Sequence, residues 1–402
     1  MKLTKTLFLS EPYRKELDVT IIDIKEHKKH KALILDSTIF YPEGGGPEGD
    51  RGFIDETYIV NTIHGDEGEI LHVVDPSCSL EIGTTHHLRL DWAHRYHYMV
   101  QHTAQHLISG ILFTSFGIDT LSVHLSDTYI AIETGEPVID QETLYHIEDE
   151  VNRAIITGGA THTKIVSQED VPILNLRRSV KVETDVRIVS IEGYDEIACG
   201  GVHVDNISEL NRVMYLMSES IRGHVRLFFL VSDIAKEEMR GYKEVVDEMK
   251  NTLSVPRERI IERVKENQLE IVSLRREVHL YQQSIIEQTL SSYMKGKETP
   301  IVMMDVSEYS FDALKVLSHI LLDVPKIVLC AIKERDKENM NYLICIKGIE
   351  HEQELYGEIK LKVLQSIKAK GGGKAPLWQG IAHNNKEILR EVEKVCNRVI
   401  YG

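Results

Sequence analysis

The chain has 402 residues, 42% of them hydrophobic and 27% charged, which is typical of a globular protein with two or three domains. It has no membrane-length apolar run, no signal-peptide core and, with five scattered cysteines, no disulfide framework, so we expect a cytoplasmic protein without a membrane partner. The net charge of −16 argues against non-specific coating of nucleic acid but allows a local basic surface.

The N-terminal half predicts an α+β arrangement in two parts. Residues 1–90 contain short β-branched stretches such as VTIIDI and KALILD, which predict a β-barrel with the glycine-rich loop FYPEGGGPEGDRG. Residues 91–232 alternate helix and strand. A helix is expected from Trp92 to Phe116, ending near Gly117, and a second helix in QETLYHIEDEVNRAII.

The C-terminal half predicts a helical linker over residues 233–297 and a separate α/β unit over residues 298–402, which closes on KAKGGGKAPLWQG and a final helix. Pro256 is expected to break or start the linker helix. Beyond it, residues at steps of three and four form a coiled-coil seam: Ile260, Val264, Asn267, Ile271, Leu274, Val278, Tyr281 and Ile285. The seam is compatible with a homodimer or with an intramolecular hairpin formed with the residues before Pro256.

Two pairs of side chains predict a metal site. His102 and His106 in HTAQH are four residues apart, so a helix places both imidazoles on one face, as metal ligands or as hydrogen-bonded core residues. Cys199 and His203 lie in ACGGVHV, where two glycines favour a tight turn over a helix. Three imidazoles and a thiolate suit tetrahedral Zn²⁺, and we therefore predict that these four residues bind zinc.

These motifs resemble the editing domain of alanyl-tRNA synthetase and its free-standing AlaX relatives. The resemblance rests on HTAQHL, CGGVHV, FYPEGGG…GDRG, DW..R, T.S.HL and RGHVRLFF, while KGGGKAPLWQG is similar to the signature of the C-terminal domain shared with DHH-type phosphoesterases (DHHA1-like). It covers essentially the whole chain and implies the architecture of a long AlaX protein. Two positions depart from the family pattern: Pro47 stands where a glutamine is expected, and Val202 replaces the threonine of CGGTH.

The resemblance implies a hydrolase that cleaves the ester of mischarged alanine tRNA, chiefly the serine ester and with the glycine ester as a second candidate, with Zn²⁺ as cofactor. Four protein ligands would close a tetrahedral site, whereas hydrolytic zinc usually keeps one position open, so we expect one ligand to bind weakly. Candidates for recognising the serine hydroxyl are Thr103, Thr120 and Ser122, although each hydroxyl could instead bond to backbone.

Candidate tRNA contacts lie in three places. Gly44, Gly45 and Gly46 could bring backbone N–H groups to phosphates or simply form a barrel turn. Arg95 and Arg222 could contact phosphate or pair with acids.

The third place is the C-terminal glycine-rich segment, where lysines, three glycines and Trp378 suit contact with an RNA backbone and base stacking, or a solvated basic face. Its candidate residues are Lys368, Lys370, Gly371, Gly372, Gly373 and Lys374.

Three other functions are compatible with parts of this pattern. A phosphoesterase would need a DHH metal cluster, and that tripeptide is absent from the sequence. A non-catalytic RNA-binding protein could carry the same residues around a structural zinc. A deacylase for another mischarged tRNA is the third alternative, because threonyl-tRNA synthetases carry a related zinc-motif domain.

Overall fold

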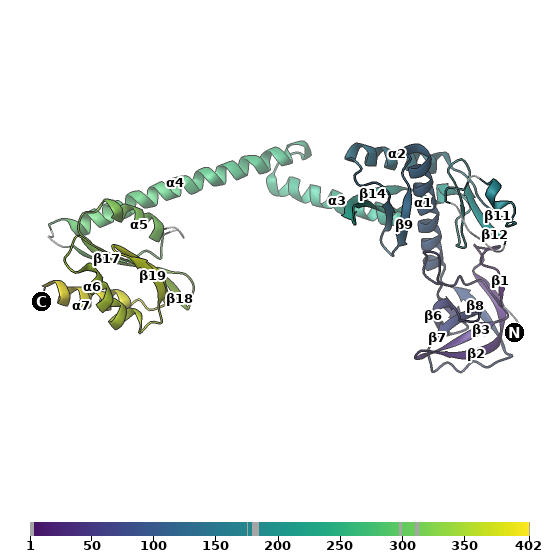
Figure 1. The fold of residues 1–402 in the computed structure, drawn as a ribbon, viewed down its shortest axis with the longest axis horizontal. Coiled ribbons are helices and arrows are strands. Elements are labelled where there is room, and N and C mark those ends of the chain that lie inside the picture. Colours follow the sequence, from purple (N-terminus) through teal and green to yellow (C-terminus); the bar gives the residue numbers. More distant parts are fainter. Residues whose placement is uncertain (1–3, 175, 179–184, 297–299, 310–312, 402) are drawn as a thin grey trace. The chain divides into compact units, whose positions relative to one another are not determined.

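The fold is described by a computed structural model that covers residues 4–174, 176–178, 185–296, 300–309 and 313–401 (Figure 1). The chain divides into two compact units, Met1–Val246 and Asp247–Gly402. Both units combine helices with sheets, which confirms the mixed α+β class. Among the described residues, no helix has the length and apolar character that crossing a membrane requires.

The first unit begins with a closed six-stranded barrel, as predicted, with strand order β2-β3-β7-β6-β5-β8. Its strands are β2 (Glu16–His27), β3 (His30–Leu35), β5 (Gly52–Ile54), β6 (Thr57–His64), β7 (Ile70–Val74) and β8 (Thr85–Leu90). Two short strands, β1 (Lys5–Thr6) and β4 (Ser37–Thr38), pair in parallel beside it. Alternate strand residues such as Val19, Leu33 and Leu88 fill the interior. The glycine-rich loop occupies residues 41–51 between β4 and β5 and contains no regular element.

The rest of this unit is built around one buried helix, α1 (Trp92–Phe116). The side chain of Asp91 caps its N-terminus by accepting from the backbone N–H of His94, and Gly117 is its C-cap, as the sequence predicted. The helix packs against β9, β10 and β15 and also against β13, so it is buried on nearly all sides from His94 to Leu112.

Two sheets and a second helix surround α1. One sheet has the order β14-β15-β10-β9 and the other has the order β11-β12-β13. The elements are β9 (Thr120–Leu125), β10 (Ile130–Thr134), α2 (Gln141–Thr157), β11 (Thr161–Val166), β12 (Val186–Ile191), β13 (Asp195–Ala198), β14 (Val213–Ile221) and β15 (His224–Val231).

The linker consists of two helices, α3 (Ser232–Leu253) and α4 (Ile260–Met294), and Pro256 lies in the break between them, as expected. The predicted seam runs along α4. Within the second unit its central residues Ile271, Leu274, Val278 and Ile285 are each about half exposed.

The second unit contains a five-stranded sheet of order β16-β17-β18-β20-β19. Its elements are β16 (Ile301–Asp305), α5 (Ala313–Asp323), β17 (Ile327–Glu334), β18 (Asn339–Lys347), α6 (Glu352–Ile359), β19 (Lys370–Lys374), β20 (Leu377–His383) and α7 (Ile388–Tyr401). The glycine-rich segment therefore forms a regular edge strand, β19, and not the flexible backbone expected from its composition.

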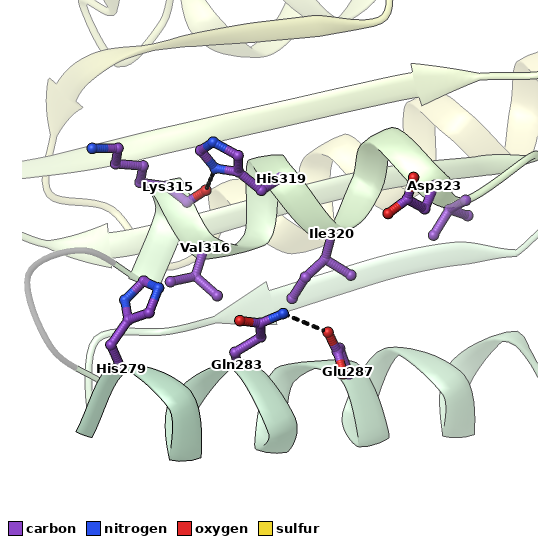
Figure 2. Close-up of a pocket in the computed structure, with 9 residues that line it drawn as sticks. His279, Gln283, Glu287, Lys315, Val316, His319, Ile320 and Asp323 are labelled. Atoms are coloured by element: carbon purple, nitrogen blue, oxygen red, sulfur yellow. Dashed lines mark hydrogen bonds between the residues drawn. The ribbon is translucent and has the colours of Figure 1, made fainter. Parts of the chain in front are cut away.

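A groove of about 650 Å³ lies between α4 and α5 (Figure 2). Gln283 and Glu287 of α4 are hydrogen-bonded to each other at 2.9 Å, and His319 of α5 bonds to the carbonyl of Lys315. The lining mixes polar and apolar side chains, and none of the predicted site residues contributes to it.

Candidate metal centre

The four predicted metal ligands converge on one point. His102 and His106 lie one turn apart on α1, Cys199 follows β13, and His203 comes four residues later. One ligand atom from each of the four lies within 4.8 Å of the others. The Sγ atom of Cys199 is 3.5 Å from Nε2 of His102 and 3.5 Å from Nε2 of His203. Zinc bonds to sulfur and nitrogen at tetrahedral angles separate the two donors by roughly 3.5 Å. The donor set therefore fits Zn²⁺.

The turn between Cys199 and His203 is held close to α1. A Cβ atom on Gly201 would lie 2.2 Å from Cε1 of His102, so only glycine allows the turn to approach the imidazole this closely. Arg187 of β12 donates from Nη1 to the carbonyl oxygens of Cys199 and Gly201, at 2.8 Å each. These two hydrogen bonds tie the turn to β12. Val202 packs in the core of the unit, so its replacement of a threonine leaves the ligands in place.

Thr103 orients the imidazole of His203. Its hydroxyl donates to the carbonyl of Met99 at 2.8 Å, so Oγ1 can only accept from its two other neighbours, the backbone N–H of Val204 and Nδ1 of His203. Nδ1 of His203 therefore carries the proton and Nε2 presents its lone pair to the cluster. Burial holds the pKa of His203 well below its usual value, which favours the neutral, metal-binding form.

The cluster stabilises a thiolate at Cys199. Burial by itself would raise the pKa of the thiol, but the imidazoles of His102, His106 and His203 outweigh burial and hold the pKa well below its usual value. A deprotonated sulfur is the form that binds metal. Cys199 is also the one residue of the four that is only partly buried.

The three candidates for recognising a substrate hydroxyl are placed differently. Thr103 is buried and all its bonds go to protein groups, so the structure gives it the orienting role just described. Thr120 of β9 is half-buried and donates to Oγ of Ser109 on α1 at 3.0 Å. Ser122 is exposed and donates to Glu133 at 3.1 Å. Only Thr120 and Ser122 therefore reach toward solvent.

The glycine-rich loop lies close to the cluster. The hydroxyl of Tyr41 donates to the carbonyl of Gly44, and the Cβ position of Gly46 faces Leu125 of β9. Burial and, after it, the charge of the Cys199 thiolate raise the pKa of Tyr41 above its usual value. The loop that carries Gly44, Gly45 and Gly46 therefore lies against the end of β9, the strand of Thr120 and Ser122.

The two arginines predicted to contact tRNA differ. Arg95 is buried, and its guanidinium pairs with Asp50 and donates to the carbonyls of Pro12 and Ile39. Of its two predicted roles, Arg95 therefore has the pairing with an acid, and its guanidinium is not available to a phosphate. Arg222 is exposed in the turn between β14 and β15 and forms no ion pair among the residues that the structure describes.

The lysines of the C-terminal glycine-rich segment are available to a ligand. Lys368, Lys370 and Lys374 are exposed, and within the described ranges none of them forms an ion pair. Gly371, Gly372 and Gly373 are exposed as well. Trp378 is not available for base stacking, because it is only 5% exposed and its ring stacks on that of Tyr356 with centroids 4.2 Å apart.

Sequence reasoning missed the residues that support the ligands from outside, above all Arg187 and Asp195. Nδ1 of His106 lies 3.2 Å from Oδ2 of Asp195. Asp195 is the first residue of β13, and Cys199 directly follows the end of this strand, four positions later. That closeness in the sequence was the available signal. Nothing in the sequence near Arg187 pointed to the cysteine turn.

Comparison with known proteins gives a match over part of this cluster. A family described as "Threonyl and Alanyl tRNA synthetase second additional domain" matches residues 186–228, which include Cys199 and His203. Two of the four candidate ligands thus lie in the segment that is similar to this family.

The whole chain is similar to a narrower group. It is 29% identical to the alanyl-tRNA editing protein AlaX-L of Pyrococcus horikoshii, with 97% of each chain covered. It is 27% identical to the alanyl-tRNA editing protein Aarsd1-A of Xenopus laevis, over 92% of this chain and 88% of that protein. An alanine–tRNA ligase of Ignicoccus hospitalis matches 98% of this chain at 25% identity, but only 43% of the ligase is covered. The chain resembles alanyl-tRNA editing proteins of the long AlaX type, as its motifs predicted.

Proposed function

We propose that this chain is a trans-editing deacylase that hydrolyses the ester of mischarged alanine tRNA, chiefly the serine ester and with the glycine ester as a second candidate. The observation that carries this proposal is the convergence of His102, His106, Cys199 and His203, in a chain that matches alanyl-tRNA editing proteins over almost its whole length. Charging of tRNA and its correction belong to translation, so we place the protein in the cytoplasm.

The four side chains would hold Zn²⁺, which when bound would polarise the ester carbonyl, activate a water or position the end of the tRNA. The chain itself supplies orientation: Thr103 fixes His203, and Arg187 fixes the cysteine turn. We also propose that one of the four residues is a weaker ligand than the others, because a closed tetrahedral site leaves no room for water. His102 is the candidate, since its buried Nδ1 has neither a hydrogen bond nor an ion-pair contact among the described residues, whereas Nδ1 of His106 lies 3.2 Å from Oδ2 of Asp195.

The direct test is deacylation of alanine tRNA charged with serine, glycine or alanine, with and without a chelator. We expect the serine ester to be hydrolysed fastest, the alanine ester to persist, and the chelator to stop the reaction. Equal hydrolysis of all three esters would contradict the proposed specificity. Hydrolysis that survives complete removal of metal would contradict the role of the four ligands.

To discriminate serine from alanine, the site needs a hydrogen-bond partner for the serine hydroxyl. When the alanine ester binds, that partner is left without a hydrogen bond, and this weakens binding of the alanine ester. Thr120 and Ser122 are the proposed partners, since both hydroxyls lie on β9, the strand that faces the glycine-rich loop through Leu125. The tRNA itself is proposed to contact Gly44, Gly45, Gly46 and Arg222 in the first unit.

In the second unit we propose that Lys368, Lys370 and Lys374 bind the tRNA backbone. Replacing all three by alanine should weaken tRNA binding and lower the slope of its salt dependence by about 2 to 3, because each phosphate contact contributes slightly less than one. Hydrolysis of a minimal aminoacyl ester should be unchanged. Filter binding at several salt concentrations measures the first effect.

A matched control replaces three exposed lysines on other elements of the same unit, namely Lys315 on α5, Lys337 in the β17–β18 turn and Lys394 on α7. The control changes the net charge equally, so an equal loss of tRNA binding in both variants would show a general charge effect and contradict a specific surface.

We further propose that the protein is a homodimer through the α4 seam and the C-terminal domain. Exposed apolar surface at Ile271, Leu274, Val278 and Ile285 would be buried by a second helix. The Leu274→Asp, Val278→Asp double variant should then be a monomer by analytical ultracentrifugation where the wild type is a dimer. A wild-type chain that sediments as a monomer would favour the intramolecular hairpin instead.

A further inference from the structure

The three imidazoles of the cluster have different partners on their outer nitrogen. Nδ1 of His203 meets the hydroxyl of Thr103. The Nδ1 atoms of His102 and His106 are both buried and have no hydrogen bond of regular geometry among the described residues. Of these two atoms, only Nδ1 of His106 has a carboxylate beside it, since Oδ2 of Asp195 lies at an ion-pair distance of 3.2 Å. A carboxylate on the outer nitrogen orients an imidazole and makes its other nitrogen a stronger metal ligand.

The Asp195 side chain is completely buried, which is unfavourable for a carboxylate unless its oxygens are paired. Both oxygens have partners here. Arg177 donates from Nε to Oδ1 at 2.7 Å and from Nη2 to Oδ2 at 3.3 Å. The guanidinium thus holds the carboxylate in one plane and leaves Oδ2 directed at His106.

A glycine in α1 allows Asp195 to lie close to the helix. Gly110 lies one turn after His106 on the helix, and a Cβ atom there would come within 2.4 Å of the carbonyl oxygen of Tyr194 and 2.9 Å of Cβ of Asp195. Only glycine permits this contact, so the turn before β13 packs directly on the helix. The same strand then leads to Cys199, so β13 has the outer partner of one proposed ligand at its start and another proposed ligand directly after its end.

We propose that Asp195, held by Arg177, is a positioning residue that keeps the proton of His106 on Nδ1 and directs Nε2 to the metal. This inference rests on the proposed zinc centre. It assigns no contact with substrate to Asp195, so the effect of losing the carboxylate is on the metal first and on hydrolysis only through the metal.

The test measures zinc affinity and the spectrum of cobalt-substituted protein for the full chain. The Asp195→Asn variant should bind zinc about 10- to 100-fold more weakly than the wild type in competition with a chromophoric chelator. Cobalt in this variant should show altered d–d bands but keep its thiolate charge-transfer band, since Cys199 is untouched. Glu196→Gln is the matched control: it removes the neighbouring carboxylate, which pairs with Lys164 instead, and should change neither property.

Asp195→Asn leaves the charge of Arg177 buried beside a neutral group, which destabilises the fold. A second variant therefore controls for misfolding. Asp195→Asn with Arg177→Gln removes both charges and should show the same weaker zinc binding. Nitrogen-15 shifts of the histidine rings in the zinc-loaded wild type test the tautomer without any variant, and His106 should carry its proton on Nδ1.

Coordination of the metal through Nδ1 of His106, or folded variants that bind zinc as tightly as the wild type, would overturn the inference while leaving the zinc centre intact. A wild-type chain that binds no zinc would instead overturn the metal centre itself, and the role of Asp195 with it.

Discussion

The Cys199→Ala variant should bind zinc much more weakly than the wild-type chain and lose about 10²- to 10⁴-fold in the rate of deacylation, because bound zinc contributes several kcal/mol to stabilising the reacting carbonyl or water. The thiolate supplies the only negative charge among the four donors, so its loss affects the metal more than the loss of a neutral imidazole. Zinc content after gel filtration and single-turnover hydrolysis of serine-charged alanine tRNA measure the two effects.

Cys78 provides the matched control for this experiment. It is a buried thiol of the barrel core, away from the cluster, and Cys78→Ala should keep both zinc and activity. Circular dichroism shows whether a variant that has lost its zinc is still folded. A Cys199→Ala variant that unfolds would support a structural zinc, whereas a folded and inactive variant supports catalysis. A folded variant with wild-type activity would contradict the proposed site.

The cluster of three histidines and one cysteine was predictable from the sequence because its two halves are local patterns. The spacing of His102 and His106 fixes their common face once α1 is recognised, and α1 itself is marked by Asp91 at its start and Gly117 at its end. The barrel and the strands of the first unit were predictable for the same reason, since alternation and glycine-rich breaks are read within a few residues.

Contacts between distant segments were not predictable in this way. The sequence left open whether Arg95 contacts a phosphate or pairs with an acid, because its partner Asp50 comes from the glycine-rich loop, 45 positions earlier. Trp378 looked available to a base, but it lies in β20, the inner neighbour of the edge strand β19, and its ring is buried against Tyr356. Asp195 was passed over because no local pattern showed that its strand would lie on α1. In each case the sequence supplied the side chain, and tertiary packing supplied its partner.

Breaking the Asp50–Arg95 pair should destabilise the first unit strongly. Arg95 is 1% exposed, and it joins α1 to the glycine-rich loop through Asp50, whose carboxylate also accepts from the backbone N–H of Tyr41. Removing one member leaves a buried charge without its counterion, so Asp50→Asn should lower the free energy of unfolding by about 3–5 kcal/mol. Chemical denaturation followed by circular dichroism measures the change.

The exposed pair of Arg51 and Asp91 is the control, with its Nε–Oδ2 distance of 3.3 Å. Arg51→Gln should lower the free energy of unfolding by less than about 1 kcal/mol, because solvent screens that pair. Replacing Asp50 and Arg95 together by Leu and Met should recover much of the loss, since apolar side chains of similar volume leave no unpaired charge. If Asp50→Asn is no more destabilising than Arg51→Gln, the pair does not hold α1 to the loop, and the position of Tyr41 must depend on other contacts.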